Sequence, residues 1–286
     1  MANPILVTGS TGTVGSEVVK QLAAAGATVR AAVQATSNTE RIKRAGVEPF
    51  IMNFADAPSL SAALEGVEKA FLLSPTTPEQ EGVTAGFVAA AKAAGLKHIV
   101  KLSVLGVDAE ADFMFGRQHR QSERLIVDSN IAFTFLRANF FMQNFLGQTS
   151  IKAQGAFYDS SGDAKASHVD VRDIAAVAVR ALTESGHEEK IYDLTGPQAL
   201  SNFEIANILT SVTGNKITYV PISDEDSRQG MQAASLPEWL IDALIELIQV
   251  KRAGYLQSIS ADVEPQLGRQ PITFEQFARD HVEAFK

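Results

Sequence analysis

Short apolar runs alternate with longer segments of helical periodicity from the start of this 286-residue chain. The runs have the length of buried strands, and the segments between them have the spacing of amphipathic helices. Strands are expected at 4–8, 28–33, 47–51, 69–73, 98–102 and 132–136, and helices at 13–25, 38–45, 58–65, 79–94 and 116–129. Buried strands joined by helices indicate a parallel, doubly wound α/β sheet, because parallel neighbours need a crossover connection. Glycines stand where several of these helices should stop, namely Gly26, Gly46, Gly66 and Gly95.

The alternation loosens after about residue 140. Further elements expected there are a turn-rich segment at 155–162, a helix from 170 to 183, strands at 190–194 and 217–220, a capping box at Ser201 and Glu204, and a mostly helical stretch over 224–286. We therefore expect a nucleotide-binding domain over 1–150 and a smaller substrate lobe over 151–286. The two should be interleaved, because the strand near 190–194 is able to return to the main sheet.

A glycine-rich turn joins the first expected strand to the first helix. Gly9, Gly12 and Gly15 follow the pattern G-x-x-G-x-x-G. In this context the first glycine permits a tight turn, the second lets the backbone approach a phosphate, and the third lets helix and strand pack closely. The helix N-terminus then presents unsatisfied N–H groups to a pyrophosphate. The turn, including Thr11, Thr13 and Val14, predicts dinucleotide binding; the alternative is a tight βα turn that binds nothing.

The end of the second strand decides between NAD and NADP. An acidic residue there would hydrogen-bond the ribose 2′-hydroxyl, whereas cations or hydroxyls accept a 2′-phosphate. Gln34 occupies the strand end, and Thr36 and Ser37 follow it. The acid is absent, and Thr36 and Ser37 supply hydroxyls that suit a 2′-phosphate, so NADP(H) is favoured. The cation is also absent, so NAD(H) remains an option. Thr36 and Ser37 also fit a plain helix N-cap.

The composition excludes several other classes of function. The chain contains no cysteine, which rules out disulfides, thiolate metal sites and a cysteine nucleophile. Its net charge of −8 disfavours a broad nucleic-acid interface. The segment around 239–250 describes an amphipathic helix that is too short and too charged to span a bilayer, and no signal peptide is visible. A soluble cytoplasmic protein with no membrane partner is expected.

Four motifs stand out along the chain: the turn at 5–15, Gly95-Leu-Lys-His-Ile-Val, the segment 134–144 and Val169-Asp-Val-Arg-Asp-Ile-Ala175. Together they resemble those of the NmrA-like branch of atypical short-chain dehydrogenases/reductases, in particular the bacterial NAD(P)H quinone reductase and triphenylmethane reductase type. The resemblance covers nearly the whole chain. It implies a Rossmann-like domain with a smaller, mostly helical C-terminal lobe, and direct hydride transfer from NAD(P)H to a quinone-like or dye-like acceptor. The alternative within the family is a non-catalytic redox sensor that binds NAD(P) and a regulatory partner.

The helix after the fifth strand departs from ordinary short-chain dehydrogenases. Those enzymes carry a Tyr-x-x-x-Lys pair there, and this chain has His119 and Glu123 four residues apart instead. The resemblance suggests a catalytic role for this pair, with His119 as a donor of a proton or a hydrogen bond at an ordinary pKa of about 6.5. Ser103 stands where the same enzymes keep a catalytic serine. The alternatives are a helix-face ion pair for His119 and Glu123, and a backbone contact for Ser103.

The remaining candidates follow the carboxyl ends of strands, where open α/β sheets bind ligands. Those assigned to the cofactor are Asn53 and Phe54 beside the adenine, Leu73, Ser74 and Pro75 along the ribose and nicotinamide, and Asn139 and Phe140. Those assigned to a planar acceptor are Phe141, Met142 and Asn144. Phe140 and Phe141 equally fit a plain core. We find no metal constellation, and a homodimer remains an option.

Overall fold

The structure is a computed structural model that describes residues 3–35, 39–108 and 112–286, without the side chain of Arg41. The chain divides into two compact units, each made of three segments. Unit 1 comprises Met1–Val104, Gln118–Arg137 and Val171–Tyr192, and unit 2 comprises Leu105–Arg117, Ala138–Asp170 and Asp193–Lys286. The chain leaves unit 1 after Val104 and returns to it twice, at Gln118 and at Val171, so neither unit is contiguous in sequence.

The main sheet contains seven strands among the described residues, in the order β3-β2-β1-β4-β5-β6-β9. They are β1 (Ile5–Val7), β2 (Val29–Val33), β3 (Val47–Ile51), β4 (Lys69–Leu72), β5 (His98–Val104), β6 (Ala132–Ala138) and β9 (Lys190–Leu194). Strand β1 pairs in parallel with β2 on one side and with β4 on the other. The strand order reverses at this point, which is where open α/β sheets form a ligand crevice.

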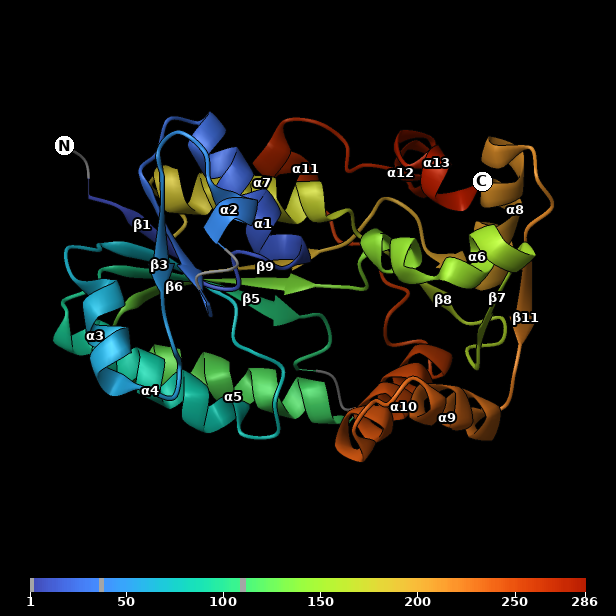
Figure 1. Ribbon diagram of the computed structural model, residues 1–286, viewed down its shortest axis with the longest axis horizontal. Helices are drawn as coiled ribbons and strands as arrows, with labels where there is room; N and C mark the ends of the chain where they lie inside the picture. The colour runs from blue at the N-terminus through green and yellow to red at the C-terminus, as the bar shows by residue number, and fades with distance from the viewer. Residues whose placement is uncertain (1–2, 36–38, 109–111) are drawn as a thin grey trace. The chain divides into compact units, whose positions relative to one another are not determined.

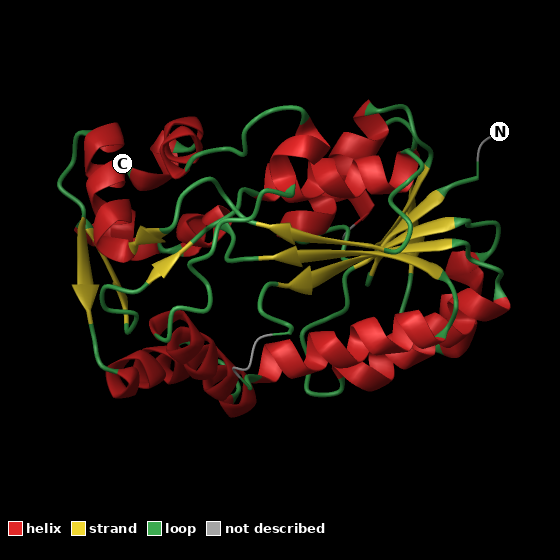
Figure 2. Ribbon diagram, turned by 180° about the vertical axis from the view of Figure 1, so that it is seen from behind, coloured by secondary structure: helices red, strands yellow, loops and turns green. Residues whose placement is uncertain are grey.

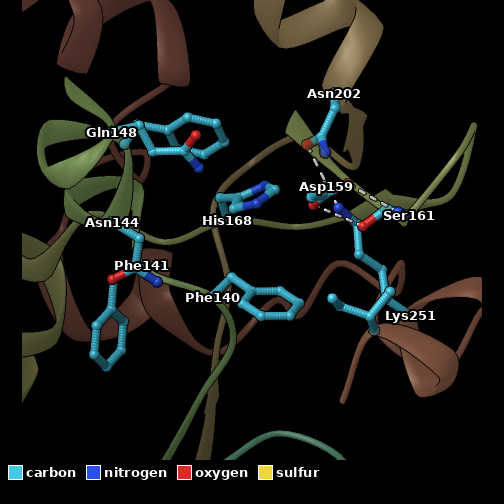
Figure 3. Close-up of a pocket in the computed structure, with 11 residues that line it drawn as sticks. Phe140, Phe141, Asn144, Gln148, Asp159, Ser161, His168, Asn202 and Lys251 are labelled. Carbon is cyan, nitrogen blue, oxygen red and sulfur yellow. Dashed lines mark hydrogen bonds between the residues drawn. The ribbon is translucent and has the colours of Figure 1, made fainter. Parts of the chain in front are cut away.

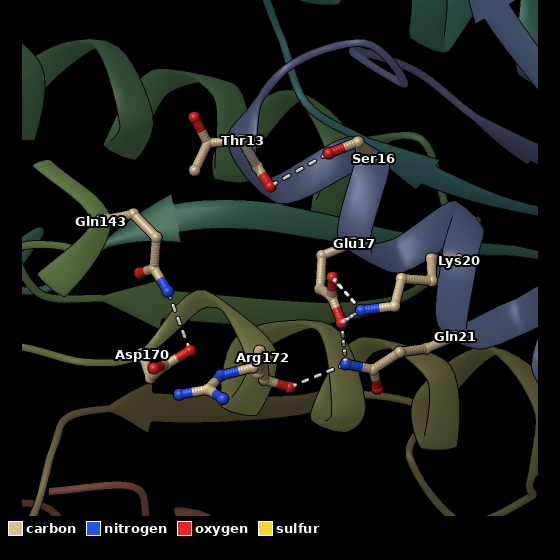
Figure 4. Close-up of polar contacts among 8 residues, drawn as sticks. All are labelled: Thr13, Ser16, Glu17, Lys20, Gln21, Gln143, Asp170 and Arg172. Atoms are coloured by element: carbon tan, nitrogen blue, oxygen red, sulfur yellow. Dashed lines mark hydrogen bonds and ion pairs between the residues drawn. The ribbon is translucent and has the colours of Figure 1, made fainter. Parts of the chain in front are cut away.

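Helices cover both faces of this sheet (Figure 1). On one face lie α1 (Thr13–Ala24) and α7 (Val171–Thr183), and on the other lie α3 (Ala57–Leu64), α4 (Gln80–Ala93) and α5 (Met114–Asp128); a short α2 spans Thr39–Ile42. The same layers are visible from behind in Figure 2. Gln21 on α1 donates a hydrogen bond of 3.1 Å to the carbonyl oxygen of Arg172 at the start of α7, which joins the two helices (Figure 4).

One part of the core of unit 1 lies between the sheet and the layer of α3, α4 and α5, and another lies under α1 and α7. In the first part, Leu6, Leu72 and Ile99 from the strands pack against Leu64 of α3 and Phe87 of α4, and all five side chains are buried. These residues stand at the apolar positions that the sequence periodicity assigns to strand and helix faces. Burial of this apolar surface is the main stabilising contribution to the unit.

Unit 2 is built from short strands and many helices. Strands β7 (Ala156–Asp159) and β11 (Thr218–Pro221) pair in parallel, and β8 (Lys165–Ala166) pairs antiparallel to β10 (Leu200–Ser201). The helices are α6 (Thr149–Gln154), α8 (Asn202–Thr213), α9 (Asp224–Ala233), α10 (Glu238–Arg252), α11 (Val263–Leu267), α12 (Phe274–Asp280) and α13 (Val282–Phe285), with a 3₁₀ helix, η2, at Met142–Gly147. The unit's own core is aromatic and contains Phe145, Phe157, Phe274 and Phe277.

The fold class expected from the sequence is confirmed, and the expected strands and helices of residues 1–136 all appear within two residues of their bounds, apart from the shortened α2. The four glycine stops have positive φ angles. The capping box at Ser201 and Glu204 is present. The turn-rich interpretation of 155–162 was wrong in part, because β7 occupies half of the segment. Only Phe157 of that strand is buried, so its sequence lacks the apolar alternation of a strand.

Among the described residues, none of the helices is both long enough and apolar enough to cross a membrane.

Candidate functional site

The turn between β1 and α1 has the geometry that its glycines predict. Gly9 has a φ of +62°, and the N–H of Gly12 donates to the Gly9 carbonyl oxygen at 2.9 Å, which closes the turn. A Cβ atom on Gly9 would lie 2.7 Å from Cδ2 of Leu73. A side chain at this position would therefore be strained by the backbone conformation, and the Leu73 side chain after β4 would have to move.

Gly15 permits the close packing of α1 on the turn. A Cβ atom built there would lie 2.1 Å from the carbonyl oxygen of Gly9, a backbone atom that no side-chain movement can displace. At Gly12 the corresponding distance to the same oxygen is 3.3 Å, and φ is −83°. The third glycine is thus required by the fold itself, whereas the second keeps space open above the turn.

A cleft of about 640 Å³ lies over this turn within unit 1. Its lining residues come from the ends of β1, β2, β3 and β4. Of the residues predicted to bind the cofactor, it includes Gly9, Thr11, Gly12, Gln34, Asn53, Phe54, Leu73 and Pro75. This volume is in the range of sites that hold small molecules and cofactors.

The cleft fits a dinucleotide through its backbone rather than through charged side chains. None of the described residues that line it is charged. Helix α1 has neither a side-chain cap at Gly12 nor an acidic residue in its first turn, as far as the described residues show. Its first N–H groups and the positive end of its dipole are therefore available to an anionic group. In contrast, Asp56 caps α3 and Ser201 caps α8.

Other residues assigned to the cofactor lie elsewhere. Val14 and Gly15 are buried beneath the turn, Thr13 is exposed on α1, and the Ser74 hydroxyl lies 3.2 Å from the hydroxyl of Thr84. Thr36 and Ser37 lie outside the described residues. The structure thus places Thr13, Val14, Gly15 and Ser74 beside the cleft rather than on its lining.

Ser103, Glu123 and Arg137 form a buried polar cluster in unit 1. The Ser103 hydroxyl at the end of β5 donates to Oε1 of Glu123 at 2.6 Å. Arg137 on β6 donates to both carboxylate oxygens of Glu123, at 3.1 Å from Nε and 2.7 Å from Nη2. The backbone contact considered for Ser103 is replaced by this carboxylate contact. The structure therefore brings together two of the three predicted catalytic residues, with Arg137 as their partner.

His119 lies one turn before Glu123 on α5, but the two form no ion pair in the described structure; Glu123 is paired with Arg137 instead. The Nδ1 atom of His119 is shielded from solvent and has no hydrogen-bond partner among the described residues. Burial, together with the nearby Lys101 ammonium, holds the pKa of His119 well below its usual 6.5. At neutral pH this imidazole is therefore uncharged. Its one N–H group can donate a hydrogen bond, but the neutral ring does not act as a proton donor.

Lys101 is a member of this cluster that sequence reasoning missed. It lies on β5 with no exposed surface, and its ammonium donates to the carbonyl oxygen of Leu102 at 3.1 Å. Burial lowers the pKa of Lys101 to about 8, against the opposing effect of the Glu123 carboxylate. A charged residue in the middle of a buried strand was the available signal, because lysine is rarely buried completely.

A second cavity, of about 160 Å³, lies within unit 2 (Figure 3). Phe140, Phe141 and Asn144 line it, so two of the three predicted acceptor residues and one predicted cofactor residue meet there. Phe140 and Phe141 are only partly buried, so neither belongs to the fully buried core. Met142 is 1% exposed and packs in the aromatic core instead.

The side chain of Asn139 is held by hydrogen bonds within unit 2. Its side-chain nitrogen donates to Oγ of Ser167 and to the carbonyl oxygen of Leu256, both at 2.8 Å, and its side-chain oxygen accepts from the N–H of Phe140 at 2.8 Å. A separate hydrogen bond of 2.9 Å, from the side-chain nitrogen of Gln143 to Oδ1 of Asp170, lies within the same unit (Figure 4). A cofactor contact through the Asn139 amide would have to share one of these bonds.

Sequence reasoning missed the charged part of the cavity in unit 2. Lys251, Asp159 and His168 line it and lie on α10, β7 and the segment after β8. Lys251 is 3% exposed and His168 is 5% exposed. Lys251 is 83 positions from His168 and 92 from Asp159, so no local motif marks the three together. A lysine among apolar residues near the end of the 239–250 helix was the only hint.

Comparisons with known proteins agree with this architecture. An NAD(P)H azoreductase of Xenophilus azovorans is 39% identical over 282 residues, which cover 98% of this chain and 99% of that protein. The crystal structure of an NADPH-dependent quinone oxidoreductase of Escherichia coli with NADPH has a TM-score of 0.87 and 29% identity, and the match covers 98% of this chain and 99% of that one. Triphenylmethane reductase of Citrobacter sp. with NADP(H) also has a TM-score of 0.87, at 26% identity and coverage of 96% and 99%.

The sequence pattern of the NmrA-like family matches residues 1–278. The resemblance seen in the sequence motifs is therefore confirmed, both for the family and for its quinone reductase and triphenylmethane reductase type. This chain belongs to the NmrA-like family.

Proposed function

We propose that this protein is an NAD(P)H-dependent oxidoreductase that reduces quinone-like or conjugated dye-like acceptors by direct hydride transfer. The observation that carries the proposal is the uncharged cleft over the Gly9–Gly12 turn, in a chain whose relatives include an azoreductase, a quinone oxidoreductase and a triphenylmethane reductase. NADP(H) is the favoured cofactor, since Gln34 at the end of β2 is not the acid that would bind the ribose 2′-hydroxyl of NAD(H). NAD(H) is the second option, since Gln34 is not a cation for a 2′-phosphate either.

The backbone of unit 1 holds the dinucleotide in this proposal. The turn at Gly9–Gly12 and the N-terminus of α1 receive the pyrophosphate. Asn53 and Phe54 flank the adenine. Gln34, Thr36 and Ser37 bind the adenosine ribose, and Leu73 to Pro75 extend toward the nicotinamide. When bound, NAD(P)H supplies the hydride. The protein contributes the position of the reacting groups and the exclusion of water.

The cavity of unit 2 receives the acceptor. Phe140 and Phe141 supply aromatic surface, and Asn144 supplies a polar group at its edge. The volume of about 160 Å³ matches one aromatic ring, since a protein cavity of roughly 150 Å³ is known to bind benzene. A planar acceptor with one inserted ring fits this space.

The cluster at β5 and α5 assists the reaction without the tyrosine and lysine of ordinary short-chain dehydrogenases. An electron-poor acceptor needs less proton transfer than a ketone does. The role of His119 as a hydrogen-bond donor to the reduced acceptor stays a prediction, because among the described residues His119 is not part of the lining of either cavity. Arg137 and Ser103 hold Glu123 in place, at 2.7 and 2.6 Å, and so join α5 to β6 and β5. In this proposal the reaction takes place in the cytoplasm. The homodimer considered from the sequence stays a prediction.

The direct test is oxidation of NADPH or NADH, followed at 340 nm under argon, with a simple quinone, an azo dye and a cationic triphenylmethane dye. We expect one cofactor oxidised for each two-electron reduction, with NADPH preferred. Tight cofactor binding without turnover of any acceptor would reject the reductase and favour the redox-sensor alternative.

A further inference from the structure

Lys251 carries an incompletely compensated charge inside the cavity of unit 2. Its side chain is 3% exposed, and in the described structure its ammonium makes a hydrogen bond to a neutral amide but no ion pair. Its ammonium donates to Oδ1 of Asn202 at 3.5 Å, which is beyond the usual range of a strong hydrogen bond. It also lies 5.8 Å from the centre of the Phe140 ring, a cation–π distance. Two of its three donor protons therefore lack a protein oxygen.

Asp159 is the nearest counter-charge but does not fill this role. Its Oδ1 accepts from the N–H of Ser161 and from the hydroxyl of Tyr219, both at 2.8 Å, and its Oδ2 accepts from the Ser161 hydroxyl at 2.9 Å. Burial lowers the pKa of Lys251, and the Asp159 carboxylate opposes this effect from a distance while its own oxygens are occupied. Figure 3 draws the contact of the lysine amine with Asn202 and, separately, the contacts between Asp159 and Ser161.

His168 adds no positive charge to the cavity. Burial, and then the Lys251 ammonium, lower the pKa of His168 to about 3, so the ring is neutral at physiological pH. Its Nδ1 lies 3.1 Å from the carbonyl oxygen of Ala166, so Nδ1 carries the proton. Lys251 is consequently the single cation among the described residues that line the cavity.

A buried ammonium with spare donors is costly to the fold unless a ligand uses it. The geometry points to a subsite for an aromatic ring bearing an anionic oxygen group such as a carboxylate, with Lys251 as its counter-ion and Phe140 against the ring. This inference rests on the proposed function, because it takes the cavity of unit 2 as the acceptor site. It goes further by naming the charge of the preferred acceptor.

Binding of benzoate and of its neutral isostere benzamide tests the subsite without turnover. We would titrate each into the NADP⁺-bound protein by calorimetry and follow the five histidine ring signals by NMR. A charged hydrogen bond contributes roughly 1.5–3 kcal/mol, so benzoate should bind at least about tenfold more tightly. The His168 signal should shift with it. Equal affinities, or a shift confined to other histidines, would overturn the inference.

Variant Lys251→Met assigns the preference to this lysine, and Lys165→Met is its matched control. Lys165 is a half-exposed lysine of the same unit, paired with Glu204 at 2.8 Å, so its removal changes the net charge equally. We expect Lys251→Met to bring the benzoate-to-benzamide ratio to near one, and Lys165→Met to leave it unchanged. A preference that survives in Lys251→Met overturns the inference. If that variant does not fold, the wild-type ratio and the His168 shift decide.

Acceptor selectivity separates this inference from the proposed function. Azobenzene-4-carboxylate should be reduced with a kcat/KM at least about tenfold above that of its 4-carboxamide, and Lys251→Met should lose that ratio while still reducing the carboxamide. Equal reduction of both by the wild type rejects the anionic subsite and leaves the reductase standing. Absence of all turnover with intact benzoate binding rejects the reductase and leaves the subsite standing.

Discussion

The two cavities of this protein differ in what builds them. The cleft of unit 1 has no charged group among its described lining residues, and the backbone of Gly9 and Gly12 forms its floor, with Gly15 packed beneath the turn. The cavity of unit 2 is lined by side chains, with Lys251 and Asp159 as its charges. A backbone site depends on where side chains are absent, whereas a side-chain site depends on which residues distant segments bring together.

Gly15→Ala should have the largest effect in the molecule. Its new Cβ would meet the Gly9 carbonyl oxygen at 2.1 Å, so the turn or α1 must move. We expect a loss of about 4 kcal/mol in the free energy of unfolding, together with loss of NADPH binding. Urea unfolding and fluorescence titration measure the two.

Gly12→Ala is the matched comparison for the turn. With 3.3 Å to the same oxygen, the variant should fold, and its affinity for NADPH should fall by about tenfold because the methyl group occupies the approach of the phosphate. Equal stability losses in the two variants would show that the roles of the glycines are wrongly divided.

Glu123→Gln should come next, because it removes the charge that Arg137 contacts in a mostly buried pair, with side chains 7% and 12% exposed. Breaking such a pair costs about 3 kcal/mol of stability. Glu184→Gln, in a pair whose side chains are 48% and 38% exposed, should cost less than about 0.5 kcal/mol. Thermal unfolding of both variants checks this; similar losses would contradict a buried role for the cluster.

Acid should destabilise the fold through its buried histidines. The pKa of His168 is lowered to about 3 and that of His98 in unit 1 to about 4. Below pH 6.5 the unfolded chain binds protons that these folded rings do not, so stability falls from pH 6.5 toward those values. Each ring contributes a slope of about 1.4 kcal/mol per pH unit.

Urea unfolding between pH 6.5 and 4.5 measures this slope. His168→Asn should reduce it by about 1.4 kcal/mol per pH unit, and so should His98→Asn, which compares the two units directly. An unchanged slope in either variant would mean that the corresponding ring takes up a proton in the folded state.

Gln34→Asp should give the smallest effect. An acid at the end of β2 accepts hydrogen bonds from a ribose 2′-hydroxyl and repels a 2′-phosphate. We expect the ratio of kcat/KM for NADPH over NADH to fall by about tenfold, with the rate on a quinone at saturating cofactor unchanged. If the ratio stays constant, Gln34 does not lie beside the ribose.

The contrast between the cavities also explains what could be read from the sequence. The alternation of apolar runs predicted the main sheet, and Gly9, Gly12 and Gly15 predicted the cleft, because these signals are local. Strand β7 was missed since only Phe157 of its residues is buried.

Tertiary contacts decided the remaining features. Helical spacing placed His119 and Glu123 on one face, but Arg137 from β6 takes the carboxylate. Lys251 and Asp159 are 92 positions apart, and only the folded chain brings them to one cavity.

The most direct measurement of the central claim is a crystal structure with NADP⁺ and an aromatic acceptor bound together. The account predicts the pyrophosphate on the Gly9–Gly12 turn and an acceptor ring in the cavity of unit 2 against Phe140, with any anionic group at Lys251. A pyrophosphate elsewhere, or an acceptor that leaves the cavity of unit 2 empty, would contradict it.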